Sequence, residues 1–102
     1  MAVVMQMRWA GISRDDYDQA VEAVGWERDP ATGGRTHIAW FEDDALHVID
    51  VWDSEEDFNR FAQDRLMPGL AAAGLLEGKG EPEVTFAPLH RQWSPDQAAA
   101  LT

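Results

Sequence analysis

The sequence contains one local pattern twice: a short hydrophobic run that ends in tryptophan, followed by a serine and several acidic residues. The first run covers residues 3–9 and precedes Ser13; the second covers residues 46–52 and precedes Ser54. A serine hydroxyl can cap a helix by accepting from a backbone amide of the first turn, and acidic side chains there favour the positive end of the helix. Each copy therefore predicts a strand followed by a helix.

The remaining segments complete this order. Gly25 fits the end of the first helix, and residues 26–35 (WERDPATGGR) predict a loop whose length suggests a lid, a cavity rim or a plain connection. Residues 36–42 predict a strand joined to 46–52 through the tight turn Asp43-Asp44. Pro68 predicts the end of the second helix near Met67, or a kink. A last strand over 83–93 contains Pro88, which suggests an edge position or a bulge.

The order β-α-β-β-α-β predicts the ferredoxin-like α+β fold, a four-stranded antiparallel sheet with two helices on one face. The chain of 102 residues predicts one domain over residues 1–93 and a C-terminal tail over 94–102. In the hairpin, alternation makes both faces largely apolar, and two helices can cover only one of them. We therefore expect a second copy on the other face, and so a homodimer.

Two segments of the chain resemble a known family. V-W-D-S-E-E-D-F at residues 51–58 and R-L-M-P at residues 65–68, in this element order, are similar to the dimeric α+β-barrel superfamily, in particular to small antibiotic-biosynthesis-monooxygenase-type proteins. The resemblance implies paired barrels and functions that range from cofactor-free monooxygenases to polyketide cyclases, lactone isomerases and haem-degrading enzymes. The haem-degrading branch typically carries a histidine on the second helix. Residues 55–70 contain none, so haem is not expected.

The composition limits the kinds of partner and cofactor that the protein can bind. The net charge is −11, with eight scattered basic residues, which argues against nucleic acid and against an anionic membrane surface. There is no cysteine, no His/carboxylate set with metal-ligand spacing and no long apolar run. We expect a cytoplasmic protein that needs no metal or other cofactor.

His37 and Asp50 are the main catalytic candidates. If Asp43-Asp44 is a two-residue turn, or if the loop spans residues 42–45, Phe41 faces Leu46 and His37 faces Asp50, with directly opposed Cβ atoms about 5 Å apart. A three-residue turn would instead set Asp50 opposite Ile38 and remove the pair. An aspartate between Ile49 and Val51 is costly to bury without a partner. A histidine partner would be oriented by the carboxylate, as a general base requires; the alternative is a structural ion pair or hydrogen bond at a sheet edge.

Other residues are candidates on weaker grounds. His90, near the predicted end of the last strand, is a second candidate base, by resemblance to the cyclase branch. Polar residues on the first strand could hold an anion, with Asp50 as a possible partner of Arg8, and aromatic residues could shape the pocket. These substrate-binding candidates are Gln6, Arg8, Trp40, Trp52, Phe58 and Phe61. Tyr17, the only tyrosine, is interpreted as helix packing, and His47 as packing or a dimer contact.

The leading hypothesis is a homodimeric barrel that binds a small hydrophobic, aromatic or polyketide-like molecule. Cofactor-free oxidation would begin when His37, oriented by Asp50, deprotonates an enol or phenol. A cyclase or isomerase that transfers protons through His37 or His90 is the alternative, and a non-catalytic ligand-binding or assembly module is the third.

Overall fold

The computed structural model describes residues 1–95. Its elements follow the expected order, with the second helical region divided into three parts. They are β1 (Val3–Ala10), α1 (Arg14–Val24), β2 (Gly34–Glu42), β3 (Ala45–Trp52), α2 (Glu55–Phe61), η1 (Ala62–Leu66), α3 (Met67–Ala72) and β4 (Glu83–Pro88). Residues 96–102, most of the expected C-terminal tail, lie outside the described part of the chain.

Both serine caps are confirmed. Ser13 Oγ accepts from the amide of Asp16, and the Asp16 carboxylate accepts in return from the amide of Ser13, which closes a capping box. Ser54 Oγ accepts from the amide of Asp57 at the start of α2. Gly25 ends α1 in the left-handed conformation, with φ of 77°. The two strand–helix junctions are therefore local consequences of the sequence.

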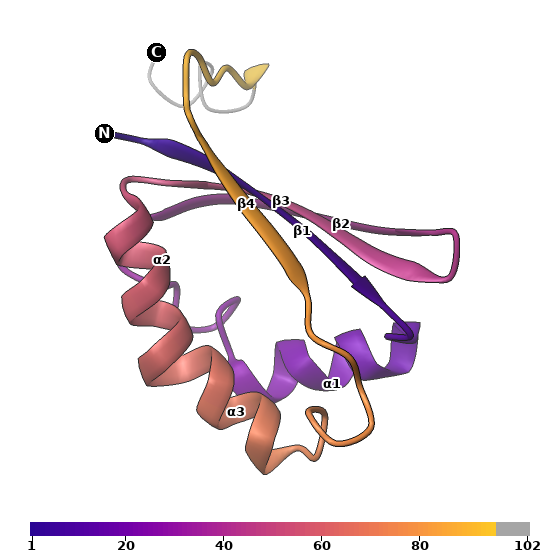
Figure 1. The fold of residues 1–102 in the computed structure, drawn as a ribbon. Coiled ribbons are helices and arrows are strands. Elements are labelled where there is room, and N and C mark those ends of the chain that lie inside the picture. Colours follow the sequence, from indigo (N-terminus) through magenta and orange to yellow (C-terminus); the bar gives the residue numbers. More distant parts are fainter. Residues whose placement is uncertain (96–102) are drawn as a thin grey trace.

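The four strands form one antiparallel sheet in the order β2-β3-β1-β4. Figure 1 shows α1 and the α2–α3 region on the same side of this sheet. This is the ferredoxin-like α+β arrangement expected from the sequence. We call the helix-covered side the inner face and the opposite side the outer face.

The β2–β3 hairpin has the expected register. Asp43 and Asp44 form the turn with φ of 53° and 58°, the positive values that a type I′ turn requires, here without glycine. The strands pair Phe41 with Leu46 and His37 with Asp50. The prediction from turn length is confirmed, because a two-residue turn leaves only one way to align the strands.

The expectation that the second helix ends near Met67 is wrong. α-Helical bonding stops at Phe61, η1 is π-helical, and the helical backbone continues to Ala72, so that α2, η1 and α3 form one continuous run (Figure 1). The amide of Met67 donates to the carbonyl of Ala62, five residues earlier. Pro68 has no amide to donate, and the wider turn before it lets the chain pass the proline without ending the helix.

The last strand is shorter than expected. β4 ends at Pro88 rather than at residue 93, and it lies at the edge of the sheet, where a proline is tolerated. Leu89 still donates its amide to the carbonyl of Ala2, but residues 89–94 form no strand. His90 therefore lies beyond the sheet.

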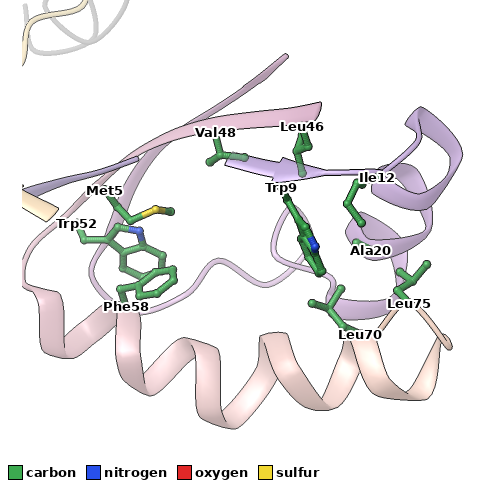
Figure 2. Packing of buried hydrophobic residues seen from close by; sticks show 10 residues of the cluster. All are labelled: Met5, Trp9, Ile12, Ala20, Leu46, Val48, Trp52, Phe58, Leu70 and Leu75. Atoms are coloured by element: carbon green, nitrogen blue, oxygen red, sulfur yellow. The ribbon is translucent and has the colours of Figure 1, made fainter. Parts of the chain in front are cut away.

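The core fills the space between the inner face and the helices. Figure 2 shows Met5, Trp52 and Phe58 together toward one end, and Trp9, Leu70 and their neighbours toward the other. Met5 is almost fully buried at the centre of the sheet, beside Asp50 on β3 and Phe86 on β4. The helices thus bury one face of the sheet and leave room for a cavity between the two groups of side chains.

Candidate functional site

A cavity of about 260 Å³ lies between the inner face of the sheet and the helices. Most of its lining is aliphatic or aromatic, and its polar groups are few. The lining residues are Met5, Met7, Trp9, Tyr17, Ala20, Trp26, Pro30, Ala31, Gly34, Arg35, Thr36, His37, Leu46, Val48, Asp50, Trp52, Phe58, Phe61, Leu66 and Leu70. Such a space, apolar with convergent polar groups on one wall, is typical of a small-molecule site.

Asp50 is the buried carboxylate of this cavity. Its exposed fraction is 6%, and it is the only buried charged side chain among residues 1–95. Trp52 Nε1 donates to Asp50 Oδ2 at 3.1 Å, and His37 Nδ1 lies 2.7 Å from Asp50 Oδ1. Each oxygen of the carboxylate therefore has a partner, which offsets the cost of burying the charge.

His37 connects Asp50 to the cavity. Its side chain is 31% exposed, against 9% for the side chain of Asp50. Because the carboxylate can only accept, the ring nitrogen that faces it, Nδ1, carries a proton. In the neutral imidazole this leaves Nε2 as an acceptor, so the carboxylate fixes the tautomer that can act as a base.

Tyr17, on α1, completes the network. Its Oη lies 2.7 Å from His37 Nε2, and its ring is nearly parallel to the imidazole, with an interplanar angle of 2°. Burial raises the pKa of the Tyr17 phenol, and the carboxylates of Glu27, Asp50 and Asp18 act in the same direction. The phenol therefore remains protonated at neutral pH and donates to Nε2.

Sequence reasoning missed the role of Tyr17. The residue fits the apolar stripe of its helix, and only the placement of α1 across the hairpin brings it to His37. Being the only tyrosine of an otherwise apolar stripe is a signal that could have drawn attention to it, but the spacing along the helix gives no link to β2.

Aromatic rings close the cavity on two sides. Trp52 contacts Phe58 and Phe61 of α2, with ring centroids 5.5 Å apart in both pairs. On the other side, Trp26 packs edge-on against His37 at 5.3 Å. The loop before β2 contributes Trp26, Pro30 and Ala31 to the wall, so it forms part of the rim.

The structure divides the residues predicted for the site into two groups. His37, Asp50, Trp52, Phe58 and Phe61 line the cavity. The remaining four candidates lie elsewhere and take no part in it: Gln6, Arg8, Trp40 and His90.

The placement of the second group has a simple geometric reason. Gln6 and Arg8 alternate with Met5 and Met7 on β1 and so point to the outer face. Arg8 lies opposite His47 and Glu83, whereas Met5 is the neighbour of Asp50, so Arg8 is not its partner. Trp40 stacks on His47 on the outer face, and His90 is exposed beyond β4.

The site has the elements of a proton-transfer centre. A buried carboxylate orients an imidazole, and the imidazole shares a hydrogen bond with a phenol on the wall of an apolar cavity. Within residues 1–95, no three histidine or acidic side chains gather closely enough to hold a metal ion. In the same part of the chain, the helices are too short or too polar to cross a bilayer.

Comparisons with known proteins place the fold. No protein-family profile matches the chain, and no curated protein matches it. Among solved structures, SnoaB from Streptomyces nogalater, described as a cofactor-independent oxygenase, is 21% identical, with a TM-score of 0.64 over 92% of this chain and 97% of SnoaB.

Two further structures show the same likeness. The ActVA-Orf6 monooxygenase of Streptomyces coelicolor, solved with the ligand nanaomycin D, is 20% identical, with a TM-score of 0.61 over 92% of each chain. Rv0793 from Mycobacterium tuberculosis is 14% identical, with a TM-score of 0.67 over 92% of this chain and all of that one. The chain therefore has the α+β fold of antibiotic-biosynthesis-monooxygenase-like proteins, and the resemblance expected from the sequence is confirmed for the fold.

Proposed function

We propose that the protein binds a small aromatic molecule in the inner cavity and removes a proton from it as the first step of a cofactor-independent oxygenation. The observation that carries this proposal is the Asp50–His37 pair at 2.7 Å, which forms the polar wall of an otherwise apolar space. A buried, hydrogen-bonded carboxylate behind an imidazole is the arrangement that general-base catalysis needs. The likeness in fold to SnoaB, a cofactor-independent oxygenase, and to the ActVA-Orf6 monooxygenase supports the oxygenase class.

The reaction balances without an external reductant. Removal of a proton from an activated ring CH₂ leaves an anion that can give electrons to dioxygen. Conversion of that CH₂ to a carbonyl places one oxygen atom in the product and releases the other as water. The role of the protein is to hold the ring, to accept the proton at His37 and to exclude water behind Trp52, Phe58 and Phe61.

The functional unit is a homodimer joined through the outer faces. Ile38 and Trp40 on β2 are 52% and 38% exposed, although both are large and apolar. Ile49 of β3, the cross-strand partner of Ile38, shares this face. A second copy would remove this apolar surface from water, and the helices of each subunit would remain outside.

Binding and chemistry can be tested separately. We expect 2-naphthol to quench the tryptophan fluorescence saturably, because Trp26 and Trp52 line the cavity. His37→Gln should weaken this response, whereas His90→Gln, at an exposed histidine outside the cavity, should not. One- and two-ring ketones with an activated CH₂, incubated with the protein and no added cofactor, should then show His37-dependent oxygen uptake.

Other outcomes would point to the alternatives. Exchange of the ring CH₂ hydrogens with deuterated water, without oxygen uptake, would indicate a proton-transfer enzyme of the isomerase or cyclase class. Saturable binding with neither activity would indicate a ligand-binding module. The absence of binding by every aromatic probe would contradict the proposal as a whole.

A further inference from the structure

The nitrogen that should accept the ligand's proton is already hydrogen-bonded. His37 Nε2 lies 2.7 Å from Tyr17 Oη, and Nδ1 faces Asp50, so both ring nitrogens have partners within the protein. Trp26 also packs edge-on against the imidazole, with ring centroids 5.3 Å apart. A ligand must therefore displace the Tyr17 hydroxyl or act through it.

We propose that Tyr17 is a catalytic residue that receives the proton of a neutral one- or two-ring hydroxyarene and passes its own proton to His37. This inference rests on the proposed function, because it assumes that the inner cavity holds an aromatic ligand. Tyr17 lines the cavity and contacts His37 directly, so its oxygen can bond the ligand on one side and the imidazole on the other.

The transfer balances in protons and charge. The O–H bond of the hydroxyarene breaks and its proton bonds to Tyr17 Oη, while the Tyr17 proton moves to His37 Nε2. The products are the arenolate and an imidazolium, and the imidazolium is paired with the Asp50 carboxylate at 2.7 Å. Tyr17 is unchanged after the step. No oxidant is needed, because no electrons leave the ligand.

The charged groups near Tyr17 and the volume of the cavity limit the charge and the size of the ligand. The negative charges of Glu27, Asp50 and Asp18 raise the pKa of Tyr17, and the whole chain has a net charge of −11. A ligand that arrives as an anion is therefore repelled. The cavity of about 260 Å³ is slightly smaller than the roughly 300–1,000 Å³ typical of sites for drug-sized ligands. One or two rings with an ionisable hydroxyl fit both limits.

Displacement of Tyr17 is the less favourable route. Its ring stacks on the imidazole and packs edge-on against Trp26 and Phe41, so the side chain is held on three sides. Moving it would break these contacts as well as the hydrogen bond to Nε2. The geometry thus favours a relay over direct contact between the ligand and His37.

4-Nitrophenol tests the relay, because its phenolate is yellow and its phenol is not. With wild-type protein we expect saturable binding and a bound probe that ionises at lower pH than the unbound probe. Tyr17→Phe should still bind the probe but lower the bound phenolate-to-phenol ratio about tenfold, which is one unit in the ionisation midpoint. His37→Gln should have the same effect, and His90→Gln should have none.

The responses of the variants distinguish failure of the relay from failure of the proposed function. If Tyr17→Phe still ionises the probe like the wild type, while His37→Gln does not, then His37 acts directly and the relay is wrong, although the proposed function stands. If the wild type does not bind 4-nitrophenol or any other aromatic probe, the proposed function fails.

The single tyrosine gives a second test that does not depend on the folding of a variant. Growth on 3-fluorotyrosine labels position 17 alone. We expect its ¹⁹F resonance to shift on saturation with 4-nitrophenol and to move little with nitrobenzene, which lacks the hydroxyl. Equal shifts with both compounds would show that Tyr17 does not contact the hydroxyl and would overturn the relay.

Discussion

His37 Nδ1 lies 2.7 Å from Asp50 Oδ1 because the two residues are direct cross-strand partners in the β2–β3 hairpin. The contact depends on one turn and one register, and no long-range packing is needed to produce it. Helix packing then buries Asp50 and leaves His37 at the cavity wall. The register of the hairpin therefore places a polar pair inside the apolar layer between the sheet and the helices.

Asp50→Asn should destabilise the fold by about 1.5–3 kcal/mol, the range for loss of hydrogen bonds to a charged group. The amide oxygen of the variant can accept from Trp52 Nε1, but its NH₂ group can donate to His37 Nδ1 only if the imidazole changes tautomer, and Nε2 then no longer accepts from Tyr17. The measurement is urea unfolding at neutral pH.

Asp53→Asn is the matched control for this substitution. Asp53 pairs with Arg35, but its side chain is 53% exposed, so its loss should cost less than about 1 kcal/mol. Equal effects of the two substitutions would mean that the Asp50 network contributes no more than a surface ion pair.

Replacing Asp43-Asp44 with Asn-Gly should stabilise the protein by about 0.5–1 kcal/mol. Both residues have positive φ, which is strained for most side chains and is the conformation that Asn-Gly prefers in type I′ turns. The register should not change, so the His37–Asp50 contact should persist. A higher urea midpoint at unchanged slope checks this; a lower midpoint would show that the aspartates make a favourable contribution of their own.

The parts of the site that could be predicted are those fixed locally. The hairpin register follows from a two-residue turn, so His37 and Asp50 could be paired from sequence. Gln6 and Arg8 could not be placed, because the face that they occupy depends on the pairing of β1 with β3, which are far apart in the chain. The contact of Tyr17 with His37 could not be predicted for a related reason, because it depends on how α1 crosses the sheet.

The second helix shows a different limit of prediction from sequence. Pro68 correctly marks an irregularity, but a proline can be accommodated by a π-helical turn as well as by a helix end. The choice depends on packing: α3 contributes Leu70 to the core, and Gly69 lies against Val24 of α1 so closely that a Cβ atom would meet Val24 Cγ2 at 2.8 Å. These tertiary contacts favour continuation of the helix through Ala72.

Asp16→Asn should reduce the acid sensitivity of the fold. The backbone amide of Ser13 and then the ammonium group of Lys79 lower the pKa of Asp16. A lowered pKa in the folded state gives stability that is fully present above the unfolded value and is lost as pH falls through the folded value. The variant should therefore lose about 1 kcal/mol at neutral pH, and this loss should shrink as pH falls through the folded value.

Asp15→Asn is the control, since it removes the same charge from the same turn at an exposed position. Thermal or urea unfolding at several pH values compares the two variants. If the stabilities of wild type and Asp16→Asn differ by a constant amount at every pH, the carboxylate of Asp16 does not contribute through its ionisation.

Ile38→Glu should convert the proposed homodimer to monomers. A glutamate in the exposed apolar patch of β2 would bury a negative charge in the interface, on subunits that already carry −11 each. A stable interface on this face should bury roughly 1,600 Å² or more in total.

Met67→Glu is the control, because Met67 is 47% exposed on the helical side, away from the outer face. Sedimentation equilibrium at micromolar concentration should show a dimer for wild type and Met67→Glu and a monomer for Ile38→Glu. Added salt should strengthen the wild-type dimer, since it screens the repulsion between two acidic subunits. A wild-type monomer at every salt concentration, or a dimer that survives Ile38→Glu, would show that the outer face is not the interface.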